Sequence, residues 1–368
     1  MVMRKELQQI LSCPRCLGDL TLKAEVLDGR EIEEGALYCE ECHTHFPIKD
    51  GVVIFGIRRK NMRERFVEID GEGKWASEVG IEAHIEYAKE SAWAGEMAVR
   101  KIRAKIGEKR GRKARVLDIG AGTGLQSWQF SKNGFESVAL ELCPDFLFAG
   151  ARLINSDIFF ERVVADCTLL PFKKGSFDVV FCRELLHHIG EPYDLLSEIS
   201  RVTASNAIVM IIDPCKSILT SSERWRKTDK AADAGVIHYY YKLKDYLDFM
   251  GKISSSFDIS GKPLQLRSAN HPFLSKILKI NGLLYQEFSN RRVQLGILFS
   301  KIEFGLIGGM IQLMALKTKE YQKDTDRELL PIDLKQVDRQ RVAFYKNELI
   351  PAVLPLFADA HNKARLHS

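Results

Sequence analysis

The chain has 368 residues, of which 45% are hydrophobic and 28% charged. This composition is typical of folded globular proteins and excludes a wholly disordered, collagen-like or coiled-coil chain. At about 150 residues per domain, the length predicts two or three domains. The formal net charge of +5 comes from 54 basic and 49 acidic residues. This balance does not by itself indicate a nucleic-acid-binding protein.

The sequence contains no apolar segment that predicts export or membrane insertion. The first residues, MVMRKELQQILSCP, lack the apolar stretch of a secretory signal. The longest apolar run without charge, Phe304 to Leu316, is shorter than the about 20 residues that span a membrane. We therefore expect a cytoplasmic protein with no membrane span.

Four of the eight cysteines form two C-x-x-C pairs, Cys13 with Cys16 and Cys39 with Cys42. A two-residue gap lets both thiolates of one turn bind a single ion, and a second such turn completes a tetrahedron. We therefore predict a structural zinc site without an open coordination position, with a hairpin over residues 20–38 between the pairs. A redox-active dithiol is the alternative.

The residues around these pairs, LSCPRCLGDL and LYCEECHTHFPIKDGVVIF, resemble a zinc-ribbon family. Its members are the small activator subunits shared by several tRNA, rRNA and release-factor methyltransferases. The resemblance covers residues 10–55 and implies a ribbon that assists a methyltransferase and performs no chemistry. We assign residues 1–57 to this ribbon and residues 58–110 to a linker and helices that precede the next domain.

From residue 111 onward, short apolar, β-branched runs alternate with helical stretches. This pattern is typical of a parallel sheet with helices on both faces. The expected strands are residues 115–119, 137–142, 162–165, 177–182 and 207–212. Because ligands of such sheets bind at the carboxyl ends of the strands, the residues that follow each strand form the predicted site.

The first of these strands leads into V-L-D-I-G-A-G-T-G, which contains Asp118, Gly120, Gly122 and Gly124. Glycines let the backbone turn sharply and approach a ligand, and the next helix presents its free N–H groups there. The dinucleotide pattern G-x-G-x-x-G is not met, because Leu125 occupies the third glycine position. Pyrophosphate is thus the weaker interpretation, and a plain tight turn is the structural alternative.

The pattern D-x-G-x-G-x-G resembles the first motif of class I S-adenosylmethionine-dependent methyltransferases of the type 11 kind. F-D-V-V-F-C-R-E-L-L-H-H-I resembles a later element of the same family. The resemblance covers residues 110–215 closely. It implies a Rossmann-like, seven-stranded sheet that binds S-adenosyl-L-methionine, with Asp118 near the methionine amino group and the glycines beneath the cofactor.

Residues after the next three strands complete the predicted cofactor site. Glu141 ends the second strand, where a carboxylate can accept hydrogen bonds from both ribose hydroxyls. Asp166 is expected to accept from the adenine amino group, with the Cys167 backbone against the ring, and Arg183 to line the methionine side. A plain strand-end acid and a turn cap are the alternatives for Glu141 and Asp166.

We assign residues 111–317 to the methyltransferase core, with an inserted substrate cap at about 216–303. Residues 318–368 are expected to form a tail of two short helices broken at Pro351 and Pro355. The tail is expected to pack on the core, with a homodimer contact as the alternative.

No catalytic residue is assigned, because transfer of a sulfonium methyl needs orientation and exclusion of water more than side-chain chemistry. His187, His188 and His238 are candidate bases for a hydroxyl acceptor. Cys215, in a D-P-C sequence, is interpreted as incidental rather than as a nucleophile.

The sequence favours a methyltransferase that acts on a small-molecule, sugar or lipid-like acceptor. One alternative is an RNA or translation-factor methyltransferase, with the ribbon and the basic segment 99–115 holding the macromolecule. This segment has no interleaved aromatic residues for base stacking, so nucleic acid is not the favoured partner. A second alternative is a non-catalytic, cofactor-binding regulatory module.

Overall fold

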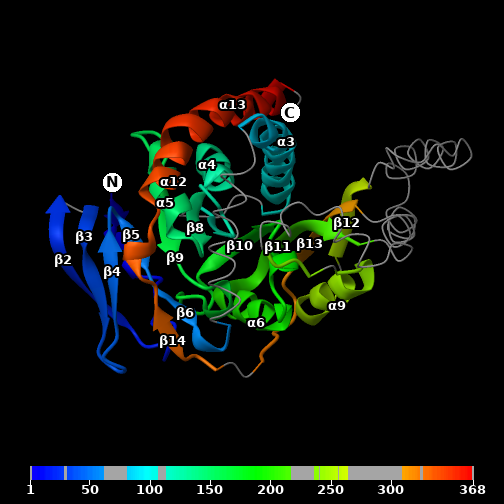
Figure 1. Ribbon diagram of the computed structural model, residues 1–368. Helices are drawn as coiled ribbons and strands as arrows, with labels where there is room; N and C mark the ends of the chain where they lie inside the picture. Colours follow the sequence, from blue (N-terminus) through cyan, green and yellow to red (C-terminus); the bar gives the residue numbers. More distant parts are fainter. Residues whose placement is uncertain are drawn as a thin grey trace, which may run out of the picture.

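The computed structural model describes residues 2–28, 31–61, 81–106, 113–216, 236–239, 241–255, 257–263, 309–323 and 326–366. Its central element is a sheet of 12 strands with helices on both faces (Figure 1). Along this sheet the strands follow the order β1-β3-β4-β5-β9-β8-β7-β10-β11-β13-β12, and β2 pairs with β3. Most of the cap predicted at about 216–303 lies outside the described residues.

Seven adjacent strands, from β9 to β12 in this order, form the predicted Rossmann-like α/β sheet. The five strands β9, β8, β7, β10 and β11 are parallel, and β13 runs antiparallel to both of its neighbours. Their bounds are β7 Arg115–Ile119, β8 Glu136–Glu141, β9 Phe160–Val164, β10 Phe177–Arg183, β11 Thr203–Cys215, β12 Phe257–Pro263 and β13 Gly309–Leu316. The five strands expected from the sequence are confirmed. The strand order reverses at β7, so the edge where β7, β8 and β10 end is the topological switch point.

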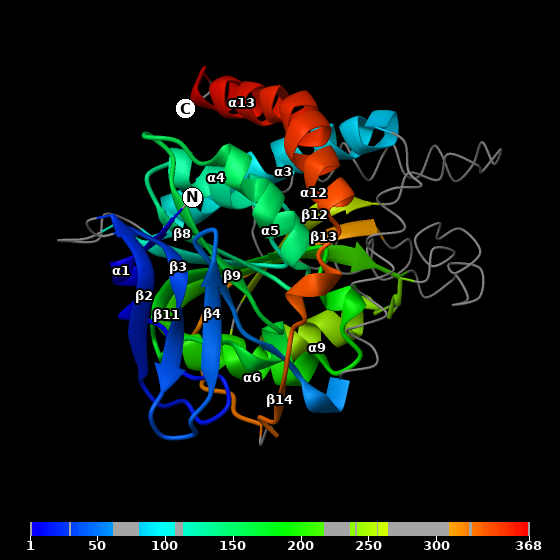
Figure 2. The same ribbon diagram turned by 60° about the vertical axis from the view of Figure 1, so that its left-hand side comes forward.

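The N-terminal segment adds its strands to the free side of β9, as Figure 2 shows for β2, β3 and β4. Here β1 is Met3–Arg4, β2 Leu20–Asp28, β3 Glu31–Cys39, β4 His45–Lys49 and β5 Val52–Ile54, with the short helix α1 at Lys5–Gln8. The hairpin of β2 and β3 confirms the prediction. β5 then pairs in parallel with β9, with Val53 opposite Val163. The ribbon and the core predicted from the sequence therefore share one continuous sheet.

Arg162 of β9 joins these two parts on the face of the sheet that α5 covers. Its side chain is 1% exposed, and its guanidinium donates to the carbonyl oxygens of Asp50 at 2.6 Å and Leu147 at 3.1 Å. Burial lowers the pKa of Arg162 to about 10, so the side chain stays charged at neutral pH. These two carbonyl groups thus fix the ribbon against helix α5, Pro144–Gly150.

Helices cover the two faces of the sheet unequally. On one face lie α3 (Ile81–Ile106), α4 (Leu125–Lys132), α5, α12 (Arg339–Phe344) and α13 (Ile350–Leu366); on the other lie α6 (Pro192–Val202) and α9 (Leu243–Ile253). Figure 1 shows α3 and α13 crossing the same side, with α6 and α9 opposite. None of the described helices is both long enough and apolar enough to cross a bilayer.

The prediction that prolines break the C-terminal tail into two short helices is wrong. A π-helical turn, η6 (Tyr345–Leu349), joins α12 directly to α13, which continues through Pro351 and Pro355. A proline inside a helix costs about 3 kcal/mol because it removes a backbone hydrogen bond. Burial of Ile350, Val353 and Phe357 in the core cluster that also contains Ala88 and Ala92 of α3 offsets this cost. The predicted packing of the tail on the core is confirmed.

The segment that follows the ribbon is fixed to the rest of the chain by a short two-stranded sheet and by an ion pair. Strand β6 (Gly56–Arg58) pairs with β14 (Leu329–Pro331). At the end of β6, Arg58 forms a salt bridge with Asp194 of α6, and the two side chains are 3% and 0% exposed. Arg58 also donates to the carbonyl of Asp326 at 2.9 Å.

We predict that Asp194→Ala lowers the free energy of unfolding by about 3 kcal/mol or more, because it leaves the guanidinium of Arg58 buried without a counter-charge. Urea denaturation measures this loss. The matched control is Lys60→Ala, which removes the exposed ion pair with Glu191 and should change stability by less than about 1 kcal/mol. Equal effects of the two substitutions would contradict the prediction.

Candidate functional site

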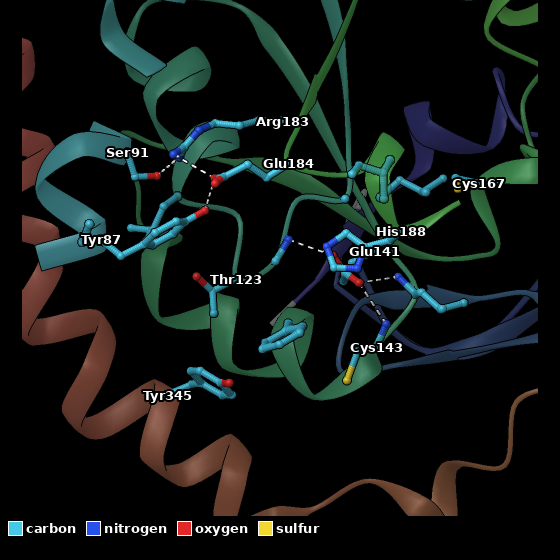
Figure 3. A pocket seen from close by; sticks show the side chains of 18 of the residues that line it. Tyr87, Ser91, Thr123, Glu141, Cys143, Cys167, Arg183, Glu184, His188 and Tyr345 are labelled. Atoms are coloured by element: carbon cyan, nitrogen blue, oxygen red, sulfur yellow. Dashed lines mark hydrogen bonds and ion pairs between the residues drawn. The ribbon is translucent and has the colours of Figure 1, made fainter. Parts of the chain in front are cut away.

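A cavity of about 400 Å³ opens where β7, β8 and β10 end. Its walls come from the turn between β7 and α4, the ends of β8 and β10, the segment after β9, and helices α3 and α13 with the turn η6. Figure 3 shows side chains from these elements pointing toward one another around it. The cavity therefore lies at the switch point, where the topology predicts a ligand site.

Three glycines shape the turn between β7 and α4. Gly120, Gly122 and Gly124 have positive φ angles of 73°, 53° and 87°, a region that L residues with side chains rarely adopt. A Cβ atom at Gly124 would lie 2.7 Å from the ring of Phe160, whereas one at Gly122 would have no atom within 4 Å. Gly120 and Gly122 line the cavity, and Gly124 lies behind them. Gly122 thus provides bare backbone with open space above it.

Glu141 ends β8 and lines the cavity beside this turn. Its carboxylate accepts hydrogen bonds from the backbone N–H groups of Gly122 at 2.9 Å, Leu142 at 2.7 Å and Cys143 at 3.1 Å (Figure 3). The carboxylate therefore fixes the turn against the end of β8. It also places a carboxylate at the cavity wall.

Asp118 does not line the cavity; it lies beneath the glycine turn and is 2% exposed. It accepts a hydrogen bond from Ser127 of α4 at 2.7 Å. Burial raises the pKa of Asp118 to about 7, the Ser127 hydrogen bond opposes this shift, and the charge of Glu141 adds to it. Its side chain therefore ties the turn to α4 and does not reach the cavity.

Asp166 and Cys167 follow β9 and line the cavity. The Asp166 carboxylate accepts from the Thr168 N–H at 2.9 Å and hydroxyl at 2.8 Å, and from the Arg58 N–H at 3.3 Å. It therefore caps the short helix η3, Cys167–Leu169, as the turn-cap alternative predicts. The same carboxylate forms part of the cavity wall, so the cap also fixes the wall.

Arg183 ends β10 on the opposite side of the cavity. Its guanidinium donates to the Ser91 hydroxyl, forms a 2.9 Å ion pair with Glu184, and lies 5.3 Å from the Tyr87 ring centre (Figure 3). Burial lowers the pKa of Arg183, but the combined electrostatic effects of the neighbouring acidic groups, among them Glu184, outweigh it and the pKa is raised. This side of the cavity therefore carries a fixed positive charge next to an acidic one.

Sequence reasoning missed the residues of α3 and the tail that cover this site. His84, Tyr87 and Ser91 reach it from α3, and Tyr345, Leu349, Val353 and Phe357 reach it from η6 and α13. On α3 the signal was present, because His84, Tyr87 and Ser91 recur at helical spacing on one face. In the tail, the apolar residues that line the cavity have the same helical spacing as residues that only pack against the core, so no sequence signal identifies them.

The three histidines singled out from the sequence all line the cavity. His187 and His188 lie on η4, Leu186–His188, directly after β10, and His238 comes from residues 236–239. Asp213 of β11, which is fully buried, lies with its Oδ1 atom 3.0 Å from Nδ1 of His187. The Asp213 pairing fixes the orientation of the His187 ring.

Cys215 is fully buried at the end of β11, and burial raises the pKa of its thiol to about 12. At neutral pH it is therefore protonated, and it is absent from the cavity wall. These properties agree with its interpretation as incidental.

The four ribbon cysteines converge at the base of the β2–β3 hairpin, and their sulfur atoms all lie within 4.8 Å of one another. The Cys13 and Cys42 sulfurs are 3.5 Å apart, and those of Cys16 and Cys39 are 3.4 Å apart. A tetrahedral Zn²⁺ with bonds of about 2.3 Å holds its sulfurs about 3.8 Å apart, so the four thiols fit zinc with small adjustments. Nearby, the Nδ1 atom of His43 is 2.9 Å from the Tyr38 hydroxyl, so this histidine has a partner outside the thiol cluster.

Comparison with known proteins places both parts of the chain. A family model described as a methyltransferase domain matches residues 117–211, and the model of Trm112p-like proteins matches residues 4–51. A ubiquinone biosynthesis O-methyltransferase of Xanthomonas oryzae pv. oryzae is 36% identical over 186 residues, which are 48% of this chain and 69% of that protein. The chain belongs to the methyltransferase family.

Other similar proteins match shorter or more distant parts. A demethylmenaquinone methyltransferase of Renibacterium salmoninarum is 36% identical over 99 residues, 27% of this chain and 40% of that protein. The chain thus spans about two fifths of the length of that relative. The solved structure of phosphoethanolamine N-methyltransferase 2 from Haemonchus contortus, in complex with S-adenosyl-L-methionine, matches 61% of this chain and 52% of its own. Its TM-score is 0.42 at 21% identity.

We predict that Cys39→Ser abolishes zinc binding by the ribbon and lowers its stability, because a small metal-bound fold draws much of its stability from the ion. Zinc released by a thiol-specific mercurial, measured against protein concentration, reports this site alone. The matched control is His43→Ala, which should release as much zinc as the unchanged protein. Undiminished release from Cys39→Ser would refute the assignment.

A second prediction concerns pH. Because the folded pKa of Asp118 is raised, its contribution to stability is complete below about pH 4 and is lost as pH rises through about 7. Asp118→Asn keeps a hydrogen-bond acceptor for Ser127 but does not ionise. Between pH 4 and 8 the variant should therefore gain about 4 kcal/mol of unfolding free energy relative to the unchanged protein. Urea denaturation along this pH series measures the difference, and a constant difference would contradict the buried carboxyl assignment.

Proposed function

We propose that this chain is an S-adenosyl-L-methionine-dependent methyltransferase that acts on a small-molecule acceptor. The observation that carries the proposal is the bare backbone of Gly122 facing open space beside the carboxylate of Glu141. An adenosyl group needs close backbone approach on one side and an acceptor for its ribose hydroxyls on the other. The names of the similar quinone-biosynthesis methyltransferases support a small-molecule acceptor.

In this proposal each predicted site residue is assigned a role that agrees with its position around the cavity. Glu141 binds the ribose hydroxyls, Asp166 and the Cys167 backbone meet the adenine, and Arg183 lies on the methionine side. Asp118 supports the turn from below through its hydrogen bond with Ser127 of α4, in place of the direct contact expected from the sequence. The sulfonium methyl group supplies the activated carbon, so these residues only hold and orient the reactants.

Helices α3 and α13 complete the proposed site by excluding water. Apolar side chains from α13, among them Val353 and Phe357, form part of the wall, and Tyr87 of α3 forms another. Exclusion of water favours a displacement in which the sulfonium loses its positive charge as its methyl group passes to the acceptor. We propose residues 318–368 as a structural part of the active-site wall, with residues 1–57 as ribbon, 58–110 as linker and helices, and 111–317 as core.

The alternative of a nucleic-acid substrate has weak support. In the described part of the basic segment, Lys101 donates to Gln312 at 2.9 Å, Arg103 donates to the Asn133 carbonyl, and Lys105 forms a 2.5 Å ion pair with Asp258. These side chains are engaged within the chain, which leaves less charge for phosphates. A cytoplasmic location and a homodimer through the tail stay predictions.

Calorimetric titration with S-adenosyl-L-methionine tests the proposal. Gly122→Val fills the space above the turn and should weaken binding at least tenfold, which corresponds to about 1.4 kcal/mol. The matched control is Gly175→Val, because Gly175 also has a positive φ, of 70°, and the nearest atom to an added Cβ is 4.0 Å away. Both substitutions place a side chain at a positive φ, but Gly175 lies outside the cavity wall.

Normal affinity in Gly122→Val, or no detectable binding by the unchanged protein, would rule out this cofactor site. A transfer assay with a labelled methyl group then distinguishes the acceptors. We expect label in a small-molecule extract and none in tRNA or in a protein extract. Label in tRNA alone would favour the nucleic-acid alternative, and binding without transfer would favour a regulatory module.

A further inference from the structure

Three histidines converge on one wall of the cavity, apart from the cysteine cluster of the ribbon. The rings of His187 and His188 have centres 4.1 Å apart, and the ring of His238 lies 4.8 Å from the first and 4.7 Å from the second. One nitrogen of each ring lies within 4.8 Å of the others. Among the described residues, only these three and the four cysteines form such a group of metal-ligand atoms.

Backbone contacts fix the position of His238 relative to the other two. The N–H of Tyr239, its neighbour, donates to the carbonyl of His187 at 2.6 Å. The hydroxyl of Tyr241 donates to the carbonyl of Ile189 at 2.6 Å. Both bonds bind the segment of His238 to the turn that carries the histidine pair. The three rings are therefore brought together by the fold rather than by chance contact of long side chains.

A buried carboxylate orients the first of these rings. Oδ1 of Asp213 lies 3.0 Å from Nδ1 of His187, and Oδ2 accepts from the His187 N–H at 3.1 Å and from the Tyr246 hydroxyl. When Nδ1–H of an imidazole donates to a carboxylate, Nε2 is left as a lone-pair donor. This carboxylate–histidine arrangement is the usual support for a metal-bound histidine.

We propose that His187, His188 and His238 bind one divalent transition-metal ion, with zinc as the favoured metal, and that its fourth position faces the cavity. A tetrahedral zinc ion with bonds of about 2.0–2.1 Å holds three imidazole nitrogens about 3.3 Å apart. Side-chain rotations that move nitrogens by about 1–1.5 Å therefore suffice. Unlike the four-cysteine site, three protein ligands leave one position open for a ligand.

The role of this ion rests on the proposed methyl transfer and narrows its acceptor to a hydroxyl compound. The hydroxyl oxygen binds at the open position, the ion lowers its pKa, and the hydroxyl proton is lost to water. The resulting oxyanion attacks the sulfonium methyl group. An O–C bond forms as the C–S bond breaks, and the sulfur leaves as the neutral thioether of S-adenosylhomocysteine.

Titration with Co²⁺ tests the site without an assay of activity. The full-length protein, with its ribbon zinc retained, is expected to bind one Co²⁺ with an absorption spectrum free of thiolate charge-transfer bands. His188→Ala and His238→Ala should each weaken this binding at least 100-fold. Asp213→Asn keeps the size of the side chain and should weaken it 10- to 100-fold through the orientation of His187.

The matched control is His84→Gln, because His84 also lines the cavity but comes from α3 and lies outside the cluster. It should bind Co²⁺ as the unchanged protein does. Circular dichroism and thermal unfolding confirm that each variant is folded. Binding of no Co²⁺ by the unchanged protein, or Co²⁺ affinity in both alanine variants equal to that of the unchanged protein, would overturn the site.

Calorimetry with S-adenosyl-L-methionine on the same proteins distinguishes the two proposals. Cofactor binding without Co²⁺ binding would refute the metal site and leave the methyltransferase proposal standing. Co²⁺ binding at the histidines without cofactor binding would refute the methyltransferase proposal and leave the metal site standing. If the unchanged protein binds both Co²⁺ and S-adenosyl-L-methionine, the His238→Ala variant should show reduced O-methylation of a hydroxyl acceptor and an unchanged affinity for the cofactor.

Discussion

The turn between β7 and α4 is the constraint on which the site depends. Its three glycines have positive φ angles, and Gly124 is packed against the ring of Phe160 from β9. The carboxylate of Glu141 on β8 ties the same turn to a second strand. Because contacts from three neighbouring strands fix the turn, the proposed cofactor meets a preformed surface rather than one that must be ordered on binding.

Much of the fold could be predicted from the sequence, because its signals are local. The five parallel strands are short apolar runs separated by helices, and the cysteine spacing indicates the ribbon hairpin. The helical tail was predicted wrongly, since Pro351 and Pro355 are strong local breakers and only burial of Ile350, Val353 and Phe357 overrides them. Likewise, the pairing of β5 with β9 joins residues far apart in the chain, for which no local pattern exists.

The candidate site, too, was predicted correctly only where the sequence signal is local. Gly120, Gly122, Glu141 and Arg183 were predicted to meet because each follows a strand end, and they do line one cavity. Asp118 was expected beside the ligand but lies below the turn, because strand alternation directs its side chain to Ser127. The walls from α3 and α13 depend on how two distant helices pack. The helical spacing of His84, Tyr87 and Ser91 marks one face of α3, but no spacing within α13 indicates which of its residues meet the cavity.

The shared sheet has a further consequence for how ribbon and core associate. Where such parts are separate molecules, their association depends on concentration, and an unpaired β9 would present an open strand edge to other chains. In this chain β5 and β9 belong to one polypeptide and pair directly. The encounter is intramolecular, with an effective concentration set by the chain itself. Dilution should therefore leave the two parts together, and each new copy of the core has its own edge covered as soon as it folds.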